Sequence, residues 1–388
     1  MAVFRPPEDR SVRDPEQFAP HLEQENGGPQ SGAERRWWTK VLSLMHPNIL
    51  LVRATLLLSL TLLSASALAA GRAYVSNEDG ETVTVLDSHD GSVVATVAVG
   101  KRPRGLKLNH DGSILYVAVS GLPKCPPTVP DEECAKLKRD LTADGIATID
   151  TRTLKLKGLL KSGSDPEQFD ISRDGKRLFV SNEDSARATV LDTGSGAIVG
   201  TIPIGHEPEG VRVSPNGKWV LVTSETDSTV SIIDSSTLKV LKTSPVGLRP
   251  RDMAFTPDSK TAFVSGEGDA SLSRVPIPAG APVSRVVQLP QQARPMGVVF
   301  DAASNRVYMS TGRGGTVAVL QVAPGGEKLL KEIPVGARPW GIALSQDGKR
   351  LYTANGPSND VTIVDTSSLS VLKKVPVGKG PWGVVVGP

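Results

Sequence analysis

Histidine and cysteine are scarce in this chain of 388 residues, which contains five histidines and two cysteines. After residue 70 the histidines are His89, His110 and His206, and no two of them have the spacing of metal ligands. The sequence also lacks a Cys-x-x-Cys-His haem attachment, a Gly-x-Ser-x-Gly nucleophile elbow and a phosphate-binding glycine loop. We therefore assign no catalytic residue and no metal ligand from sequence motifs.

A strong excess of one charge is missing as well. The chain has 44 Lys+Arg against 41 Asp+Glu, which argues against a nucleic-acid-binding protein with a basic face. Aromatic residues make up only 4%, and no long stretch after the N-terminus has helical periodicity. Glycine (38) and proline (30) are abundant. This composition favours an all-β protein with many turns.

The N-terminus differs from the rest of the chain. Residues 1–44 are polar and are expected to be disordered if translated, with Met45 as the alternative start. Residues 45–69 read as a secretory signal peptide, because Arg53, an apolar run and Ala67-Leu68-Ala69 follow in order. The apolar run is too short to span a bilayer comfortably. We expect cleavage near Ala69 or Ala70 and a periplasmic protein with no stable membrane span.

A glycine-proline loop recurs seven times in residues 70–388. Its prolines are Pro103, Pro166, Pro208, Pro250, Pro295, Pro339 and Pro381. Successive prolines are 63, 42, 42, 45, 44 and 42 residues apart. Four strands can be read in each interval, which is the geometry of a propeller blade. The long first interval predicts an insertion at residues 120–143 in blade two.

The two ends of the repeat region predict how the ring closes. The region starts with the second strand of a blade at residues 73–77 and ends with a lone first strand at residues 382–386. The C-terminal strand can therefore complete the first blade and remove the open sheet edges. We predict a seven-bladed β-propeller of four-stranded blades, closed by this pairing.

Strands such as Ala73-Tyr74-Val75-Ser76-Asn77 resemble the YVTN-type propeller repeat over essentially all of residues 71–388. The loops at residues 76–79, 181–184 and 205–210 resemble those of one subgroup, the β-propeller protein associated with PQQ-dependent alcohol catabolism. This resemblance implies an exported protein. It also implies a PQQ-dependent dehydrogenase, a c-type cytochrome or an ABC transporter component as partner. No cofactor is predicted to be bound, and PQQ enters only through the resemblance.

Strand order places the proline loops and the turns between second and third strands on one face, around the central channel. We predict a ligand-binding face there, where a rigid scaffold presents loops. Its candidate residues are Arg102, Arg104, Glu167, His206, Glu209, Arg249, Arg251, Arg294, Arg338, Trp340 and Trp382. The charges could bind an anionic or zwitterionic ligand, or they could pair with each other across the channel mouth. The two tryptophans could stack on a flat ligand or pack against the proline loops.

Acidic residues recur on the same face, in the turns that begin at Glu78, Glu183, Glu225 and Glu267. They could hold calcium, or they could form solvated or locally hydrogen-bonded turns. A second set of aspartates closes the third strands and is predicted to bond to turn amides. This set is Asp87, Asp150, Asp192, Asp234 and Asp365.

The insertion in blade two contains both cysteines, Cys125 and Cys134. In an oxidising compartment we expect them to form a disulfide that closes a small loop. The acidic and then basic residues after Pro130 predict a short helix. We expect the insertion to form a tethered flap over the ligand face.

Three functions remain open at this stage. The first is a non-catalytic periplasmic propeller that binds a partner protein or small ligand and serves PQQ-dependent alcohol oxidation. The alternative is a propeller enzyme, similar to a lactonase or a dehydrogenase subunit. It would need a converging acid-base set in the channel, or a metal held by residues such as Glu209 and His206. The last is a structural module of the cell surface. The sequence identifies neither the ligand nor the oligomeric state.

Overall fold

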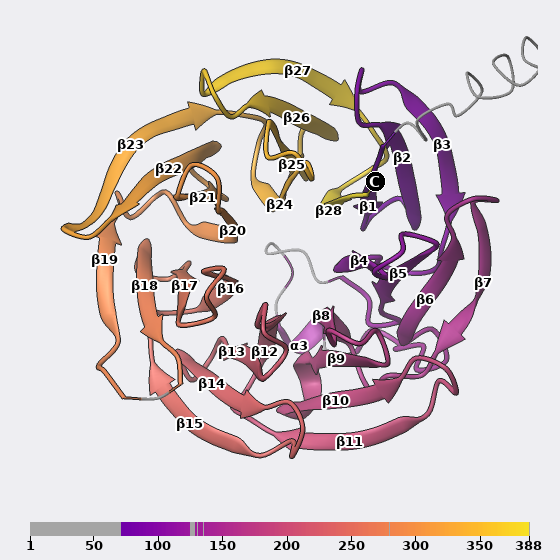
Figure 1. The fold of residues 1–388 in the computed structure, drawn as a ribbon. Coiled ribbons are helices and arrows are strands. Elements are labelled where there is room, and N and C mark those ends of the chain that lie inside the picture. The colour runs from indigo at the N-terminus through magenta and orange to yellow at the C-terminus, as the bar shows by residue number, and fades with distance from the viewer. Residues whose placement is uncertain (1–70, 125–128, 130, 135, 279, 388) are drawn as a thin grey trace, which may run out of the picture. The chain divides into compact units, whose positions relative to one another are not determined.

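Seven four-stranded antiparallel sheets form a ring in the computed structural model of the chain (Figure 1). The structure describes residues 71–387 except 125–128, 130, 135 and 279. Each sheet is one blade, and its first strand lies at the channel. The predicted seven-bladed propeller is therefore confirmed. Among the described residues, no helix is long and apolar enough to cross a membrane.

The strands follow each other in the same order in every blade. Blade 1 contains β28 (Pro381–Val386), β1 (Arg72–Asn77), β2 (Thr82–Asp87) and β3 (Val93–Ala98). Blade 2 contains β4 (Leu106–Leu108), β5 (Ile114–Val119), β6 (Gly145–Asp150) and β7 (Lys155–Leu160). Blade 3 contains β8 (Pro166–Ile171), β9 (Arg177–Asn182), β10 (Arg187–Asp192) and β11 (Ile198–Pro203), with the 3-10 turn η1 (Glu183–Ser185).

The remaining blades repeat this pattern. Blade 4 contains β12 (Pro208–Val213), β13 (Trp219–Ser224), β14 (Thr229–Asp234) and β15 (Val240–Pro245). Blade 5 contains β16 (Pro250–Phe255), β17 (Thr261–Gly266), β18 (Ser271–Pro276) and β19 (Ser284–Gln288). Blade 6 contains β20 (Pro295–Asp301), β21 (Arg306–Thr311), β22 (Thr316–Ala323) and β23 (Gly326–Pro334). Blade 7 contains β24 (Pro339–Leu344), β25 (Arg350–Asn355), β26 (Asp360–Asp365) and β27 (Ser370–Pro376).

The hydrophobic core lies between adjacent blades. The second and third strands of each blade are buried on both faces, so they read as nearly continuous apolar and β-branched runs. Between blades 1 and 2, for example, Tyr74 and Val85 share one cluster with Leu115 and Ile149. The outer strands are largely exposed. Every blade has a β-bulge or similar irregularity between its third and fourth strands, a device that makes an outer edge harder to extend.

The ring closes as the sequence predicts. β28 pairs antiparallel with β1, and Val384 and Val386 lie opposite Val75 and Ala73. Figure 1 shows the C-terminus beside β1. Asp87 and the other aspartates that close the third strands also behave as predicted, because their carboxylates accept hydrogen bonds from turn amides or hydroxyls two or three residues further on.

Closure by β28 predicts that Val384→Asp destabilises the propeller strongly. Val384 is 8% exposed and packs in one cluster with Tyr352 and Ile363. An unpaired carboxylate there should lower the free energy of unfolding, measured by urea denaturation, by about 3 kcal/mol or more. The control is Val371→Asp on outer strand β27, where valine is 38% exposed and the loss should stay below about 1 kcal/mol. Equal losses would mean that β28 does not hold the ring.

Candidate functional site

The residue after each loop proline points to the central channel and forms what we call the waist ring. In blade order, the waist ring consists of Trp382, Arg104, Glu167, Glu209, Arg251, Met296 and Trp340. The residue before each proline has a positive φ, between 43° and 62°, in all seven loops. One repeated loop conformation therefore presents seven different side chains to the same level of the channel.

Close contacts with the preceding blade fix the backbone of the waist ring. Ser76 Oγ of blade 1 donates a hydrogen bond of 2.6 Å to the carbonyl of Arg104 in blade 2. Ser181, Ser265 and Ser310 make the same contact to the next blade. A Cβ atom at Gly383 would lie 2.8 Å from the Arg104 carbonyl oxygen, which is too close for any other residue. The backbone behind the waist ring is thus tightly packed.

Arg104 is the centre of the first charged cluster and is 2% exposed. Its guanidinium donates to Asp165 Oδ1 at 2.5 Å and to Glu183 Oε2 at 3.2 Å, and it also contacts Glu167. One buried arginine therefore faces three carboxyl groups. Full ionisation of all three would leave negative charge uncompensated inside the protein.

Arg251 is the centre of a second cluster, which also has three carboxyl groups. Its guanidinium donates to Glu267 Oε2 at 2.7 Å and contacts Glu209 and Glu225. Arg249 reaches Glu225 and Glu267 from the solvent side. Of the two alternatives for the charged face, the structure shows pairing between arginines and glutamates. Negative side chains of neighbouring blades share each buried arginine.

Burial raises the pKa values of some of the shared carboxyl groups, whereas the neighbouring arginines lower those of Asp165 and Glu267. Burial, together with the negative charge of Glu167, raises the pKa of Glu183 to about 8. Burial also raises the pKa of Glu209 well above its usual range, against the opposing effect of Arg251 and with Glu167 adding to it. Burial would likewise raise the pKa of Glu78, but Arg102 and Lys124 outweigh it and lower that pKa. The face thus carries both proton-bearing and ionised carboxyl groups.

A cavity of about 600 Å³, which we call the loop-side chamber, lies on the proline-loop side of the waist ring. Eight predicted residues line it: Arg102, Arg104, Glu167, Glu209, Arg251, Arg338, Trp340 and Trp382. It is also lined by Glu78, Asp79, Glu183, Lys124 and Lys379, which the sequence did not select as ligand-binding residues. The chamber therefore collects carboxyl groups, cations and two indole rings in one place.

Three predicted residues do not line the loop-side chamber. His206 has a side chain that is 74% exposed, and its Nδ1 lies 3.1 Å from Asp227. Arg249 is held outside by Glu225 and Glu267, and Arg294 Nε lies 3.9 Å from Glu267. These three share the loop position of the others, but that position does not determine where each side chain turns. Their role as ligand-binding residues stays a prediction.

Glu78, Glu183, Glu225 and Glu267 share one position, the first residue after the second strand of blades 1, 3, 4 and 5. All four contact arginines, so the interpretation of these turns as solvated or merely locally bonded was wrong for the glutamates. Within the described residues, no group of three His, Cys, Asp or Glu side chains could hold a metal ion. The sequence did contain a sign of this pairing, because glutamate recurs after the second strands on the same face as the loop arginines.

Trp340 and Trp382 pack against each other, with ring centroids 5.5 Å apart. The guanidinium of Arg338 lies 5.0 Å from the centre of the Trp340 ring, a cation–π contact. Within the described part of the chain, Arg338 has no carboxylate within ion-pair distance. Arg338 on Trp340 is thus a cation that is available to a ligand in the loop-side chamber.

The insertion leaves the propeller between β5 and β6 and reaches the loop-side chamber. Lys124 lines it and lies 3.0 Å from Glu78 and 2.8 Å from Asp79. The predicted short helix is present as α3 (Asp131–Cys134). Cys125 and the side chain of Cys134 lie outside the described residues, so the disulfide stays a prediction.

Two family models match parts of the chain. A model described as a YNCE-like β-propeller matches residues 128–217, and one described as lactonase, 7-bladed β-propeller, matches residues 236–382. A curated relative, Antigen Lp49 of Leptospira interrogans, is 30% identical over 109 residues. That match covers 28% of this chain and 22% of the relative.

Solved structures share the fold at low identity. The periplasmic gluconolactonase of Pseudomonas aeruginosa superposes with a TM-score of 0.64 at 18% identity, covering 82% of this chain and 99% of that one. Hydrazine synthase of Kuenenia stuttgartiensis superposes with a TM-score of 0.64 at 23% identity, covering 76% and 92%. A candidate 6-phosphogluconolactonase of Bacteroides fragilis reaches a TM-score of 0.67 at 16% identity, covering 83% and 99%. These identities support the fold alone.

The lactonase match corrects the first functional hypothesis. The prediction of a non-catalytic accessory protein is wrong, and the enzyme alternative agrees better with the match over residues 236–382. The physical reason lies in the channel, where carboxyl groups with raised pKa values meet arginines in the acid-base set that an enzyme needs. The sequence contains no motif of fixed spacing for these carboxyl groups and arginines, because they come from several blades.

The buried cluster around Arg251 predicts that Arg251→Met lowers the free energy of unfolding by about 3 kcal/mol or more, since it leaves the Glu209 carboxyl group buried without its cation. The matched control is Arg249→Met. Arg249 contacts Glu225 and Glu267 as well, but its side chain is 53% exposed, so its loss should stay below about 1 kcal/mol. Urea denaturation measures both. Similar losses in the two variants would show that the cluster is not a buried one.

Proposed function

We propose that this chain is a propeller hydrolase that opens the ring of a sugar lactone in the loop-side chamber. The proposal is carried by Glu183, whose side chain is 29% exposed, whose pKa is raised to about 8, and which lies 3.2 Å from Arg104. Proton transfer is efficient when the pKa of the transferring group lies near the working pH. Glu183 has this property at the edge of a chamber that solvent and substrate can enter.

The residues of the chamber fit the steps of lactone hydrolysis. Water adds to the lactone carbonyl carbon, and the Glu183 carboxylate takes the proton that the water loses. Arg338 supports the negative charge that develops on the carbonyl oxygen. The ring C–O bond then breaks, and the ring oxygen takes a proton from Glu209, a carboxyl group whose pKa burial raises well above its usual range. The product is the open hydroxy acid, and no oxidant or reductant is needed.

The lactonase match supports this assignment through position as well as through its description. Residues 236–382 include Arg251, Arg338, Trp340, Lys379 and Trp382, all of which line the loop-side chamber. The cavity of about 600 Å³ lies within the usual size of small-molecule sites. The named activity of the Pseudomonas aeruginosa neighbour suggests glucono-1,5-lactone as the first substrate to test.

Export to the periplasm is part of the same proposal. The pattern of residues 45–69 supports it, although these residues lie outside the described part of the chain. The Pseudomonas aeruginosa neighbour is itself described as periplasmic. A PQQ-dependent dehydrogenase, a c-type cytochrome or an ABC transporter component as partner stays a prediction from the sequence resemblance.

Turnover of glucono-1,5-lactone should fall about 100-fold or more in kcat/KM in Glu183→Gln, because glutamine occupies the same space but transfers no proton. For the unsubstituted chain, kcat/KM should rise as the pH increases through about 8, since the ionised carboxylate is the active base. Release of acid measures the rate once spontaneous hydrolysis has been subtracted.

Asp184→Asn provides the control for this experiment. Asp184 is the next residue along the chain and contacts Arg139 and Ser164. It does not line the loop-side chamber, so its substitution should leave kcat/KM unchanged. Lactone hydrolysis at the spontaneous rate, or equal activity of Glu183→Gln and the unsubstituted chain, would contradict the proposal.

A further inference from the structure

A second cavity, of about 390 Å³, lies on the other side of the waist ring. On that side the first and second strands of a blade are joined by tight turns, several of them Asp-Gly as at Asp111-Gly112, and we call this cavity the turn-side chamber. Glu209, Arg251, Trp340 and Trp382 line both cavities. These four side chains therefore form the partition between two chambers of one channel. The hydrolase proposed above uses only the loop-side chamber, so the turn-side chamber has no assigned role.

Charged side chains line one half of the turn-side chamber. Lys107 and Arg212 occupy the same place in β4 and β12, four residues after the loop proline. Arg212 Nη2 donates to Asp252 Oδ2 at 2.8 Å. Asp252 also accepts hydrogen bonds from the backbone amides of Met253 and Val298, so three donors hold its carboxylate in place. Arg212 and Asp252 form a closed pair that does not need a ligand.

The Lys107 ammonium group has fewer hydrogen-bond and ion-pair partners than Arg212 has. Within the described residues, its one ion-pair partner is Asp170, whose Oδ1 lies 3.5 Å from Lys107 Nζ, and Asp170 already accepts the backbone amides of Ile171 and Val213. Asp252 lies further away and also acts on the ammonium group. Burial lowers the pKa of the Lys107 ammonium, and the positive charge of Arg212 adds to this effect. An ammonium group has three N–H donors, so most of the donors of Lys107 at the chamber wall can bond to a ligand. The Lys107 side chain is 26% exposed, and a half-buried cation of this kind is stabilised by an anion.

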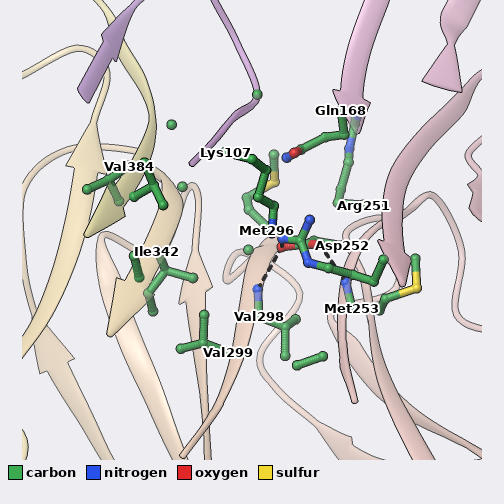
Figure 2. A pocket seen from close by; sticks show the side chains of 18 of the residues that line it. Lys107, Gln168, Arg251, Asp252, Met253, Met296, Val298, Val299, Ile342 and Val384 are labelled. Atoms are coloured by element: carbon green, nitrogen blue, oxygen red, sulfur yellow. Dashed lines mark hydrogen bonds and ion pairs between the residues drawn. The ribbon is translucent and has the colours of Figure 1, made fainter. Parts of the chain in front are cut away.

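Apolar side chains line the other half of the turn-side chamber. Val299, Ala343 and Val385 occupy the position of Lys107 in blades 6, 7 and 1, and Ile342 and Val384 precede two of them. Figure 2 shows Ile342 and Val384 on one side of the chamber, and Arg251 and Asp252 on the other. The chamber therefore has a cationic corner and a facing hydrocarbon wall.

We propose that the turn-side chamber binds a small amphipathic monoanion, a medium-chain carboxylate. The carboxylate group accepts hydrogen bonds from Lys107, and the hydrocarbon tail lies along Val299, Ala343 and Val385. The acidic neighbours Asp170 and Asp252 leave no room for a second negative charge on the ligand. A polar group at one end and an apolar wall at the other are the usual features of a site that orients its ligand.

Isothermal titration calorimetry of the full chain with sodium octanoate tests the proposal. Octanoate should bind saturably with one molecule per chain. Butanoate, which keeps the charge and shortens the tail, and octylamine, which keeps the tail and reverses the charge, should each bind about tenfold more weakly or worse. Lys107→Met should weaken octanoate binding about tenfold or more. The control Lys157→Met, at an exposed position on β7, should bind like the unsubstituted chain.

Two further variants keep the test decisive. Ala343→Leu fills the chamber from its apolar side and should also weaken octanoate binding. If Lys107→Met does not fold, Ala343→Leu alone tests whether octanoate binds in the turn-side chamber. Arg338→Met, in the loop-side chamber, should leave octanoate binding unchanged. Absence of saturable octanoate binding, or undiminished affinity in folded Lys107→Met or in Ala343→Leu, would overturn the proposal. Loss of binding in Arg338→Met alone would place the anion in the loop-side chamber and would overturn it too.

Discussion

Two buried arginines, each shared by three carboxyl groups, set the chemistry of the channel. Arg104 faces Asp165, Glu167 and Glu183, and Arg251 faces Glu209, Glu225 and Glu267. Arg102 and Arg249 add positive charge beside them, but burial still raises the pKa values of Glu167, Glu183 and Glu209. The pKa of Glu183 is raised to about 8, so this group keeps a proton at neutral pH. This constraint creates acid-base groups without a metal-binding motif or a catalytic signature in the sequence, and it holds neighbouring blades together at the same time.

The scaffold brings these groups together by repetition. Each proline loop has the same backbone conformation, so substitution at one repeated position changes the lining of the channel without changing the fold. Blades 3 and 4 supply Glu167 and Glu209 to the waist ring, blades 2 and 5 supply the flanking arginines, and blades 7 and 1 supply the two tryptophans. The waist ring separates a charged loop-side chamber from a turn-side chamber that is half apolar. Two cavities with different chemistry thus arise from one ring of seven side chains.

The sequence predicted the fold because the information about it is local and repeated. Proline spacing, Asp-Gly turns and the lone terminal strand determine seven blades and their closure. Six of the seven waist-ring residues were selected for the same reason. The pairing was not predictable, because Arg104 meets Asp165 and Glu183 only when blades 2 and 3 are placed side by side. The direction of a side chain was not predictable either. His206 lies in a proline loop as expected, but its side chain turns outward to Asp227. The raised pKa values of the carboxyl groups depend on these contacts between blades, and so does the enzyme hypothesis.

Infrared spectroscopy of the carboxyl groups tests the central claim most directly. A protonated carboxyl group has a carbonyl stretching band that disappears when the group ionises. We predict that the full chain keeps such a band at pH 7 and loses part of it as the pH rises through about 8. This part should be missing in Glu183→Gln. A spectrum in which every carboxyl group is already ionised at pH 7 would contradict the account.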